Sequence, residues 1–435
     1  MKHTCLKEFI WYASLNVLGM IGLSCYILAD TFFVAQGLGS TGLAALNLAI
    51  PVYSFIPGSG LMIGMGGATR YSILQGQKKS KESSIVFSHT LMLLFAFAIL
   101  FILTGLCFSK PLTLLLGADS ATFEMCRTYL RILLLFSPLF LLNDSLLCFV
   151  RNDGAPQLAM IALTAGSLSN IVLDYIFIFP LGMGIFGAVL ATSCAPVISL
   201  LILSTFFLRK RNHFHIVAFK PAFTISKLIF STGVPSLVTE VSSGIVIIVF
   251  NIIILGLSGN SGVAAYGVIA NLSLVIIAIY TGIAQGMQPL VSRYFGFDSK
   301  YQIRLILRYA SITVALLSAL IYFCVFFWAD GITAIFNREQ DAALQAIAVP
   351  GLRIYFLGCM FAGLNIVLCT YLSCTDHVKP ANILSLLRGF LIILPLAFLL
   401  AALGGMTGLW AVFPTTEFLV FLMAWIVIKK HSYRL

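Results

Sequence analysis

Five acidic residues lie inside long apolar stretches of the sequence, where carboxyl groups are rare. They are Asp30, Asp144, Asp174, Glu240 and Glu417. An ionised carboxylate at the centre of a bilayer costs about 2.5–3.5 kcal/mol even on a mild insertion scale. Such a group is kept neutral by a proton or balanced by a cation. The chemistry open to these residues is therefore reversible binding of protons or cations.

Two of these acids, Asp30 and Asp174, fall at the same depth. At about 1.5 Å per residue, each is roughly 10 Å from the outer end of its span, and Thr192 of the next span lies at that depth. Tyr26 and Asn170 precede the two aspartates by four residues, one helical turn deeper on the same faces. We expect these five side chains to form one polar layer that binds protons or cations. The alternative is that each is satisfied separately by local hydrogen bonds.

The other three acids have weaker assignments. Glu240 lies in the inner half of its span, where it is a candidate for lining a central cavity and attracting cations. Asp144 stands close to Arg151 in the sequence and is expected to be structural. The role of Glu417, near mid-depth in the last span, is open.

The composition excludes a soluble or disordered protein. Of 435 residues, 26 are Lys or Arg and 15 are Asp or Glu, so about 9% are charged, and 60% are hydrophobic with a mean hydropathy of +1.04. Soluble domains carry about 25% charged residues. A globular surface cannot be covered with so few polar groups, and a disordered chain is far less apolar. The chain is therefore expected to be an integral membrane protein.

Twelve apolar stretches are long enough for spanning helices, which need about 20 residues. They run over 10–36, 45–74, 85–108, 128–150, 157–180, 185–208, 233–257, 264–290, 306–328, 347–372, 381–403 and 407–428. None shows the alternating polarity of a transmembrane β-strand. The sequence predicts an all-α membrane protein with twelve transmembrane helices.

The basic residues predict the orientation. With twelve spans, 21 of the 26 Lys and Arg fall on the side of the two termini, which the positive-inside rule places in the cytoplasm. We therefore expect a multi-pass protein of the cell (inner) membrane whose net charge of +11 reflects topology and anionic lipid headgroups, not nucleic acid. Ten cysteines without a C-x-x-C pair predict neither disulfides nor a metal site. The absence of a Walker A motif predicts transport driven by gradients.

The two halves of the chain resemble each other at a shift of about 220 residues. Gly39, Gly42, Ala44 and Ala45 align with Gly259, Gly262, Ala264 and Ala265, and Asp153 with Asp376 at a shift of 223. Six helices per half predict parallel repeats related by an axis along the membrane normal. We expect two pseudo-symmetric six-helix lobes around a central cavity. The N-lobe would be 1–208, the cytoplasmic linker 209–232 and the C-lobe 233–435.

The sequence resembles the multidrug and toxic compound extrusion (MATE) transporters over its whole length. The segment from Tyr26 to Val34, the run from Arg151 to Gly154, and the segment from Asn170 to Asp174 are similar to the prokaryotic branch related to the DNA-damage-inducible protein F. The resemblance implies an N-lobe cation or proton site formed by residues at set spacing, here Tyr26, Asp30, Asn170, Asp174 and Thr192.

The sequence departs from this family in two places. The branch that binds sodium in the C-lobe uses a Glu of helix seven, which Glu240 matches, and an Asp of helix ten. The tenth span, 347–372, contains no acid, so coupling through the N-lobe is favoured. Some relatives also carry a proline early in helix one, where this chain has Leu15, Asn16 and Gly19. Whether this helix bends during transport is left open.

The resemblance implies a secondary antiporter that expels amphipathic organic cations and drugs in exchange for protons, with sodium as the alternative ion, by alternating access. No cofactor is expected besides the coupling ion. The expected partners are small organic cations and the lipid bilayer, with no nucleic acid, and the resemblance implies a monomer. The alternative function is a flippase for lipid-linked precursors or polysaccharides, which would need cationic side chains in its cavity; almost none lie in these spans. No clustered catalytic residues are visible, so an enzyme is not expected.

Overall fold

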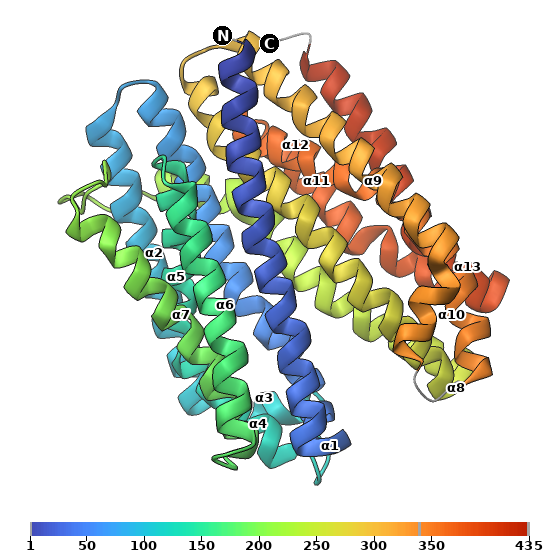
Figure 1. Cartoon of the computed structure of the whole chain (residues 1–435). Helices are drawn as coiled ribbons and strands as arrows, with labels where there is room; N and C mark the ends of the chain where they lie inside the picture. The colour runs from blue at the N-terminus through green and yellow to red at the C-terminus, as the bar shows by residue number, and fades with distance from the viewer. Residues whose placement is uncertain (1, 338–340, 433–435) are drawn as a thin grey trace. The chain divides into compact units, whose positions relative to one another are not determined.

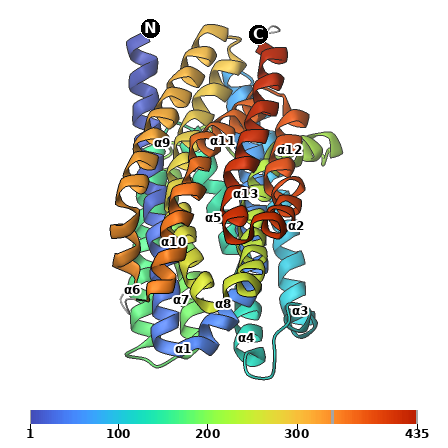
Figure 2. The same cartoon turned by 90° about the vertical axis from the view of Figure 1, so that its right-hand side faces the viewer.

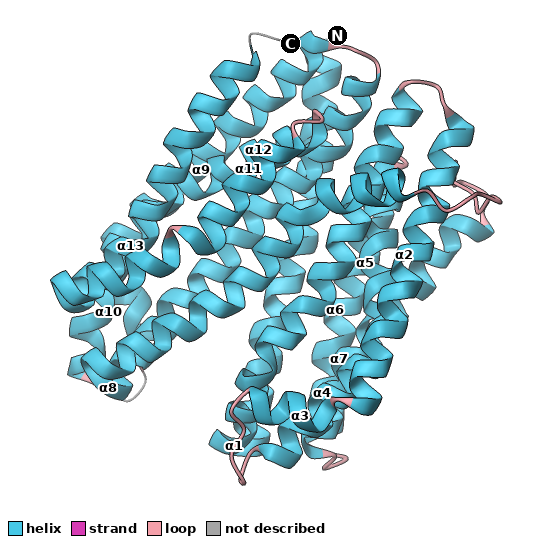
Figure 3. Ribbon diagram, turned by 180° about the vertical axis from the view of Figure 1, so that it is seen from behind, coloured by secondary structure: helices cyan, strands magenta, loops and turns pink. Residues whose placement is uncertain are grey.

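The computed structural model describes residues 2–337 and 341–432, and within these ranges all regular secondary structure is helical (Figure 3). Met1, 338–340 and 433–435, which belong to the predicted lobes, lie outside the described residues. The helices are α1 (Lys2–Gly76), α2 (Ser80–Cys107), α3 (Ser109–Leu115), α4 (Phe123–Leu135), α5 (Ser137–Asn152), α6 (Pro156–Ile178), α7 (Gly184–Leu208), α8 (Phe223–Gly296), α9 (Lys300–Phe336), α10 (Ala342–Tyr355), η1 (Phe356–Gly358), α11 (Cys359–Cys374), α12 (Val378–Leu386), η2 (Leu387–Leu391) and α13 (Ile393–Ser432).

The helices give the twelve predicted spans. Among the described residues, nine helical stretches are long and apolar enough to cross a membrane, and a tenth forms if α4 and α5, which meet at a bend of 52°, are one span. Two of these stretches, Phe223–Gly296 and Val378–Lys430, are broken inside by Gly259 and Gly405 and so contribute two spans each. The all-α class with twelve transmembrane helices is confirmed.

The backbone repeats where the two halves of the sequence align. Residues with positive φ recur in pairs 220 to 223 positions apart: Gly39 and Gly259, Lys78 and Asp298, Gly154 and Asp376, Gly182 and Gly405. Each pair marks the end of a helix or a break within one. Corresponding connections of the two halves therefore share a backbone conformation as well as a sequence pattern.

The described chain divides into two compact units. Unit 1 comprises Met1–Val17, Ser242–Val291 and Ser299–Leu435, and unit 2 comprises Leu18–Val241 and Ser292–Asp298. In unit 1, the start of α1 and the end of α13 lie at the same end (Figures 1 and 2). In unit 2, α3, α4 and the first break of α1 lie together at one end (Figure 1). The predicted lobe boundaries at 208 and 233, and the cavity between lobes, stay predictions.

The predicted linker, 209–232, is partly helical, because α8 begins at Phe223. Hydropathy identifies only the apolar part of a spanning helix. The helix α8 begins earlier, in the more polar residues that precede its apolar part. The remaining stretch, 209–222, belongs to unit 2 and is held there by hydrogen bonds and aromatic packing. The backbone N–H groups of Val217 and Ala222 donate to Ser88 Oγ and His89 Nε2, both at 3.0 Å. Phe214, 1% exposed, packs among aromatic rings of Tyr71, Phe87, Phe149, Phe206 and Phe207.

Glycines let two helices of unit 2 touch at the backbone. A β-carbon built on Gly66 of α1 would overlap the carbonyl oxygen of Ile229 in α8, and one on Gly233 would overlap that of Met62. Small residues allow such close approach of helices in membranes. The first turns of α8 are therefore fixed against α1 within unit 2.

Candidate functional site

Asp30 on α1 and Asp174 on α6 are brought together in unit 2. Their carboxyl groups lie within hydrogen-bonding reach of each other. Both are buried, at 8% and 0% exposure. The Oδ1 atom of each has no hydrogen-bond partner among the described residues. The two acids that the sequence placed at one depth thus form a contacting pair.

Small residues on α1 bring these helices together. A β-carbon on Gly22 would lie 3.6 Å from the side chain of Thr164 in α6, and one on Gly37 would overlap Ile178. Gly166 of α6 plays the same part toward α7, since its β-carbon would lie 3.0 Å from the carbonyl oxygen of Ala195. The three predicted helices therefore touch along glycine-containing faces, which brings their polar side chains within reach.

Asn170 links the aspartate pair to α7. With its amide oriented to satisfy both neighbours, Nδ2 donates to Asp174 Oδ2 at 2.9 Å and the amide oxygen accepts from the backbone N–H of Thr192 at 3.1 Å. Asn170 is fully buried and Thr192 is 2% exposed. The Thr192 hydroxyl donates to the carbonyl oxygen of Ala188 at 3.0 Å. Asp30, Asn170, Asp174 and Thr192 thus form one continuous network.

Tyr26 reaches this network through a residue that the sequence analysis missed. Its hydroxyl is hydrogen-bonded to that of Tyr53, in the second half of α1. Tyr26 also interacts electrostatically with Asp30. A second tyrosine, Tyr129 of α4, lies beside Asp30, Asp174 and the side chain of Thr192. A tyrosine in an apolar span is commonplace, so neither Tyr53 nor Tyr129 gave a sequence signal comparable to that of a carboxylate.

The arrangement has a definite chemical property. Ionised carboxylates are acceptors only, so two of them can share a hydrogen bond only when one carries a proton. Two interacting acids then titrate as a pair. Buried carboxylate and amide oxygens also suit a small cation. The cluster can therefore hold a proton or a small cation.

Glu240 and Asp144 lie near each other in unit 2 and interact electrostatically. Glycines on α1 face both: a β-carbon on Gly58 would lie 3.2 Å from that of Glu240, and one on Gly60 would lie 3.1 Å from Asp144 Oδ2. Tyr53 interacts with both acids as well as with Asp30. Tyr53 therefore stands between the predicted site and this second acidic pair, which sequence spacing did not reveal.

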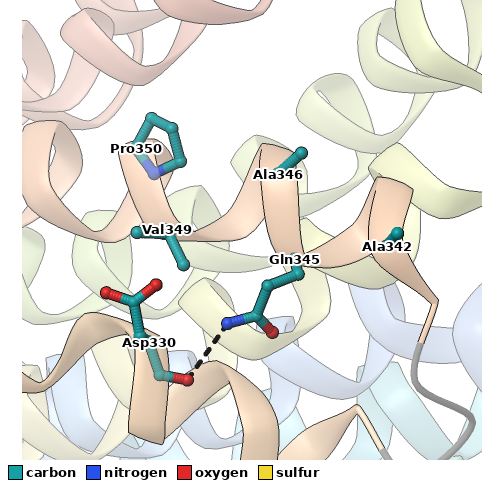
Figure 4. A pocket seen from close by; sticks show the side chains of 6 residues that line it. All are labelled: Asp330, Ala342, Gln345, Ala346, Val349 and Pro350. Atoms are coloured by element: carbon teal, nitrogen blue, oxygen red, sulfur yellow. Dashed lines mark hydrogen bonds between the residues drawn. The ribbon is translucent and has the colours of Figure 1, made fainter.

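The fifth acid, Glu417, is not part of this site. It lies in unit 1 and pairs with Arg388. A surface hollow of about 440 Å³ also lies in unit 1, lined by Asp330, Ala342, Gln345, Ala346, Val349 and Pro350 (Figure 4). Gln345 donates to the backbone oxygen of Asp330 at 3.1 Å, and the Asp330 carboxylate pairs with Arg353. The hollow contains none of the predicted site residues.

Twelve spanning helices with acids buried between them define a multi-span membrane transporter. The chain belongs to the MatE family, whose model matches residues 17–176 and 235–399. Members of this family are transporters and not enzymes, so the class and the family expected from the sequence are confirmed. The predicted branch within the family stays a prediction.

Individual relatives agree with this assignment. The chain is 27% identical over 410 residues to the multidrug export protein MepA of Staphylococcus saprophyticus, covering 94% of this chain and 90% of the relative. An outward-facing multidrug resistance MATE family transporter of the MOP superfamily matches with a TM-score of 0.91 and 23% identity, over 98% of this chain and 96% of that one. A MOP superfamily transporter from Pyrococcus furiosus, described as having a binding pocket of reverse polarity, matches with a TM-score of 0.88, 23% identity and coverage of 97% and 96%. These structural likenesses show the shared fold.

Proposed function

We propose that the protein is a multidrug efflux antiporter that exports amphipathic organic cations in exchange for protons. The observation that carries the proposal is the buried contact between Asp30 and Asp174 on two different spanning helices. The MepA relatives, which are multidrug export proteins, support the cargo class. The protein would work in the cell membrane with both termini in the cytoplasm, as the distribution of Lys and Arg indicates.

Proton exchange at the pair would drive the cycle. A proton that enters from the outer side would bind between the carboxyl groups of Asp30 and Asp174. It would neutralise one negative charge in the polar layer that these residues form with Asn170 and Thr192. Loss of that proton toward the cytoplasm restores the charge. If the two charge states favour opposite-facing conformations, binding of protons and binding of cargo are reciprocally linked.

The cargo site would include Glu240. Its carboxyl group, with that of Asp144 nearby, gives this region of unit 2 an acidic character suited to cations. A pyrophosphate-bearing lipid precursor, the cargo of the alternative flippase function, would be repelled by the same groups. Glu240→Gln should therefore weaken apparent affinity for cationic dyes more than for neutral ones.

The deciding experiment is ethidium efflux from proteoliposomes under separate ion gradients. An imposed pH gradient without sodium should drive efflux, and a sodium gradient without a pH gradient should not. Efflux driven by sodium alone would replace the proton as the coupling ion. No ethidium transport under either gradient, together with movement of a lipid-linked precursor, would favour the flippase.

A further inference from the structure

The connection between α7 and α8, residues 208–223, has a basic outer surface. Its basic residues, all of them exposed, are Arg209, Lys210, Arg211 and Lys220, and it contains no Asp or Glu. Asp153, the acid that contacts this connection among the described residues, has only 5% of its side chain exposed. It is occupied by hydrogen bonds from His213 and Tyr71. The positive charge of the connection is therefore directed outward and is not neutralised by an acid beside it.

The same connection exposes large apolar side chains. Leu208 is 79% exposed, Ile216 78% and Phe223 82%. Exposed apolar groups bordered by polar residues mark contacts with proteins or membranes. Ile216 lies well outside the apolar stretches 185–208 and 233–257, so its exposure is not that of a lipid-facing residue within a span. The connection therefore presents both charge and apolar area to its surroundings.

Unit 2 holds the connection in place from its inner side. Phe214 is buried in the aromatic cluster described above. Three backbone N–H groups donate to side chains of unit 2: that of His213 to Asp153, that of Val217 to Ser88 and that of Ala222 to His89. The outward side chains thus belong to an ordered segment, which loses little conformational freedom when it binds a partner.

The position of the connection indicates which partner it meets. The helix α7 is long and apolar enough to cross a membrane, and it ends at Leu208, so the connection begins at the edge of the apolar region. It projects sideways from unit 2, at a level below the start of α2 in Figure 1 and again in Figure 3. A basic and apolar segment at this level faces the headgroup layer of the bilayer.

We propose that residues 208–223 form a binding site for anionic phospholipids. The four basic side chains would contact the phosphate groups, while Ile216 and Phe223 would enter the boundary between headgroups and acyl chains. Segments at a membrane surface bind through buried apolar area together with electrostatic attraction to anionic lipids. Basic clusters next to a spanning helix are typical of this attraction. The lipid contact is independent of the coupling ion and of the cargo proposed above.

Removing the basic side chains tests the headgroup contact. The melting temperature of the purified wild type should rise to a plateau with added phosphatidylglycerol, and more than with phosphatidylcholine of the same acyl chains, because a ligand that binds the folded state stabilises it. Arg209→Gln/Lys210→Gln/Arg211→Gln/Lys220→Gln should lose most of this difference. The matched control, Lys7→Gln/Lys300→Gln/Lys429→Gln/Lys430→Gln, removes as many charges from exposed lysines of unit 1 and should keep it. Equal losses in the two variants, or no loss in the first, would overturn the proposal.

A single cysteine tests the apolar contact and covers the case in which the quadruple variant does not fold. In nanodiscs that contain phosphatidylglycerol, Ile216→Cys should react with an uncharged, water-soluble maleimide several-fold more slowly than in nanodiscs of phosphatidylcholine alone, because apolar surroundings disfavour the reactive thiolate. Lys79→Cys, at a half-exposed position just before α2, should react equally in both. The unsubstituted protein, in which Cys25 and Cys107 are exposed, gives the background. An equal rate for Ile216→Cys in the two lipids, which is the result expected if the segment served a soluble partner, would contradict the lipid contact.

Discussion

Gly39 and Gly259 break their helices with nearly the same backbone geometry, at φ 65°, ψ −161° and φ 62°, ψ −153°. The first separates the two spans of α1, and the second separates those of α8. The residues are 220 positions apart in the sequence. Each half of the chain therefore makes its first reversal in the same way, by one glycine and without a loop.

Alanine at either glycine should destabilise the protein to a similar extent. This backbone region is essentially restricted to glycine, and occupying it with another residue costs about 1–3 kcal/mol. Gly39→Ala and Gly259→Ala should each lower the melting temperature measured by fluorescence-detected size exclusion. The matched control is Gly256→Ala, where no atom lies within 4 Å of the new β-carbon and alanine suits the helix. A loss at one glycine only would argue that the two breaks are not equivalent.

Asp30→Asn and Asp174→Asn should each abolish proton-driven ethidium efflux while leaving expression and folding intact. The amide keeps the size and polarity of the carboxyl group but cannot take up or release the proton that the pair would share. Efflux from proteoliposomes under a pH gradient provides the measurement, with the rate of empty liposomes as the expected result. Glu82→Gln, which changes an exposed acid 3.7 Å from Lys79, should transport normally. Wild-type efflux from either aspartate variant would remove that residue from the mechanism.

Tyr53→Phe should slow efflux without abolishing it. The substitution removes the hydroxyl bonded to Tyr26, and a neutral hydrogen bond contributes about 0.5–1.5 kcal/mol. A rate reduction of up to about tenfold is expected, since 1.36 kcal/mol corresponds to a factor of ten. Tyr301→Phe, at a side chain that is 51% exposed, is the control. Unchanged rates at all pH values would show that Tyr53 does not support the carboxyl pair.

The contribution of Asp153 to the stability of the folded protein should depend on pH. It accepts hydrogen bonds from Tyr71 Oη at 2.6 Å and from the His213 backbone N–H at 2.8 Å. Burial raises the pKa of Asp153 above its ordinary value, although these hydrogen bonds act in the opposite direction. The native state then holds the proton more tightly than the unfolded state. Its contribution to stability is complete below the ordinary carboxyl pKa and is lost as pH rises through the raised value.

Asp153→Asn isolates this contribution, because asparagine keeps an acceptor for Tyr71 but does not titrate. The melting temperature of the wild type minus that of the variant should fall as the pH rises above the ordinary carboxyl pKa of about 4. A difference that is independent of pH would mean that Asp153 has the same proton affinity in both states.

The sequence could identify Asp30 and Asp174 because a carboxyl group in an apolar span has few explanations, and helix rise alone places the two at one depth. It could not identify Tyr53 or Tyr129. Their participation depends on which face of each helix points toward the site. A helix that is apolar on all sides gives no sequence signal for this rotation. The i, i+4 relation of Tyr26 to Asp30 was clear in sequence, but the long side chain carries the Tyr26 hydroxyl to Tyr53.

The sequence also did not predict which side chains pair between segments that are far apart along the chain. Arg388 and Glu417 are 29 residues apart on either side of a helix break, and the role of Glu417 was open from the sequence. Asp144 was expected to be structural because Arg151 is close in sequence. The structure shows Arg151 Nη2 directed at the sulfur atoms of Met65 and Cys148, and it places Asp144 near Glu240. The structural role expected of Asp144 stays a prediction.

The glycine contact between α1 and α8 affects how the polypeptide could be divided. Residues 223–241 of α8 are bound into unit 2 through Gly233 and Gly66, while the first turns of α1 belong to unit 1, where Ala13 and Val17 meet Gly286 and Gly282. Cutting the chain between 209 and 222 would therefore separate each of these helix segments from its packing partner. The start of α1 would lose the second half of α8, and the start of α8 would lose the second half of α1. Neither fragment should be stable when produced alone, and complementation should require that both are translated in the same cell.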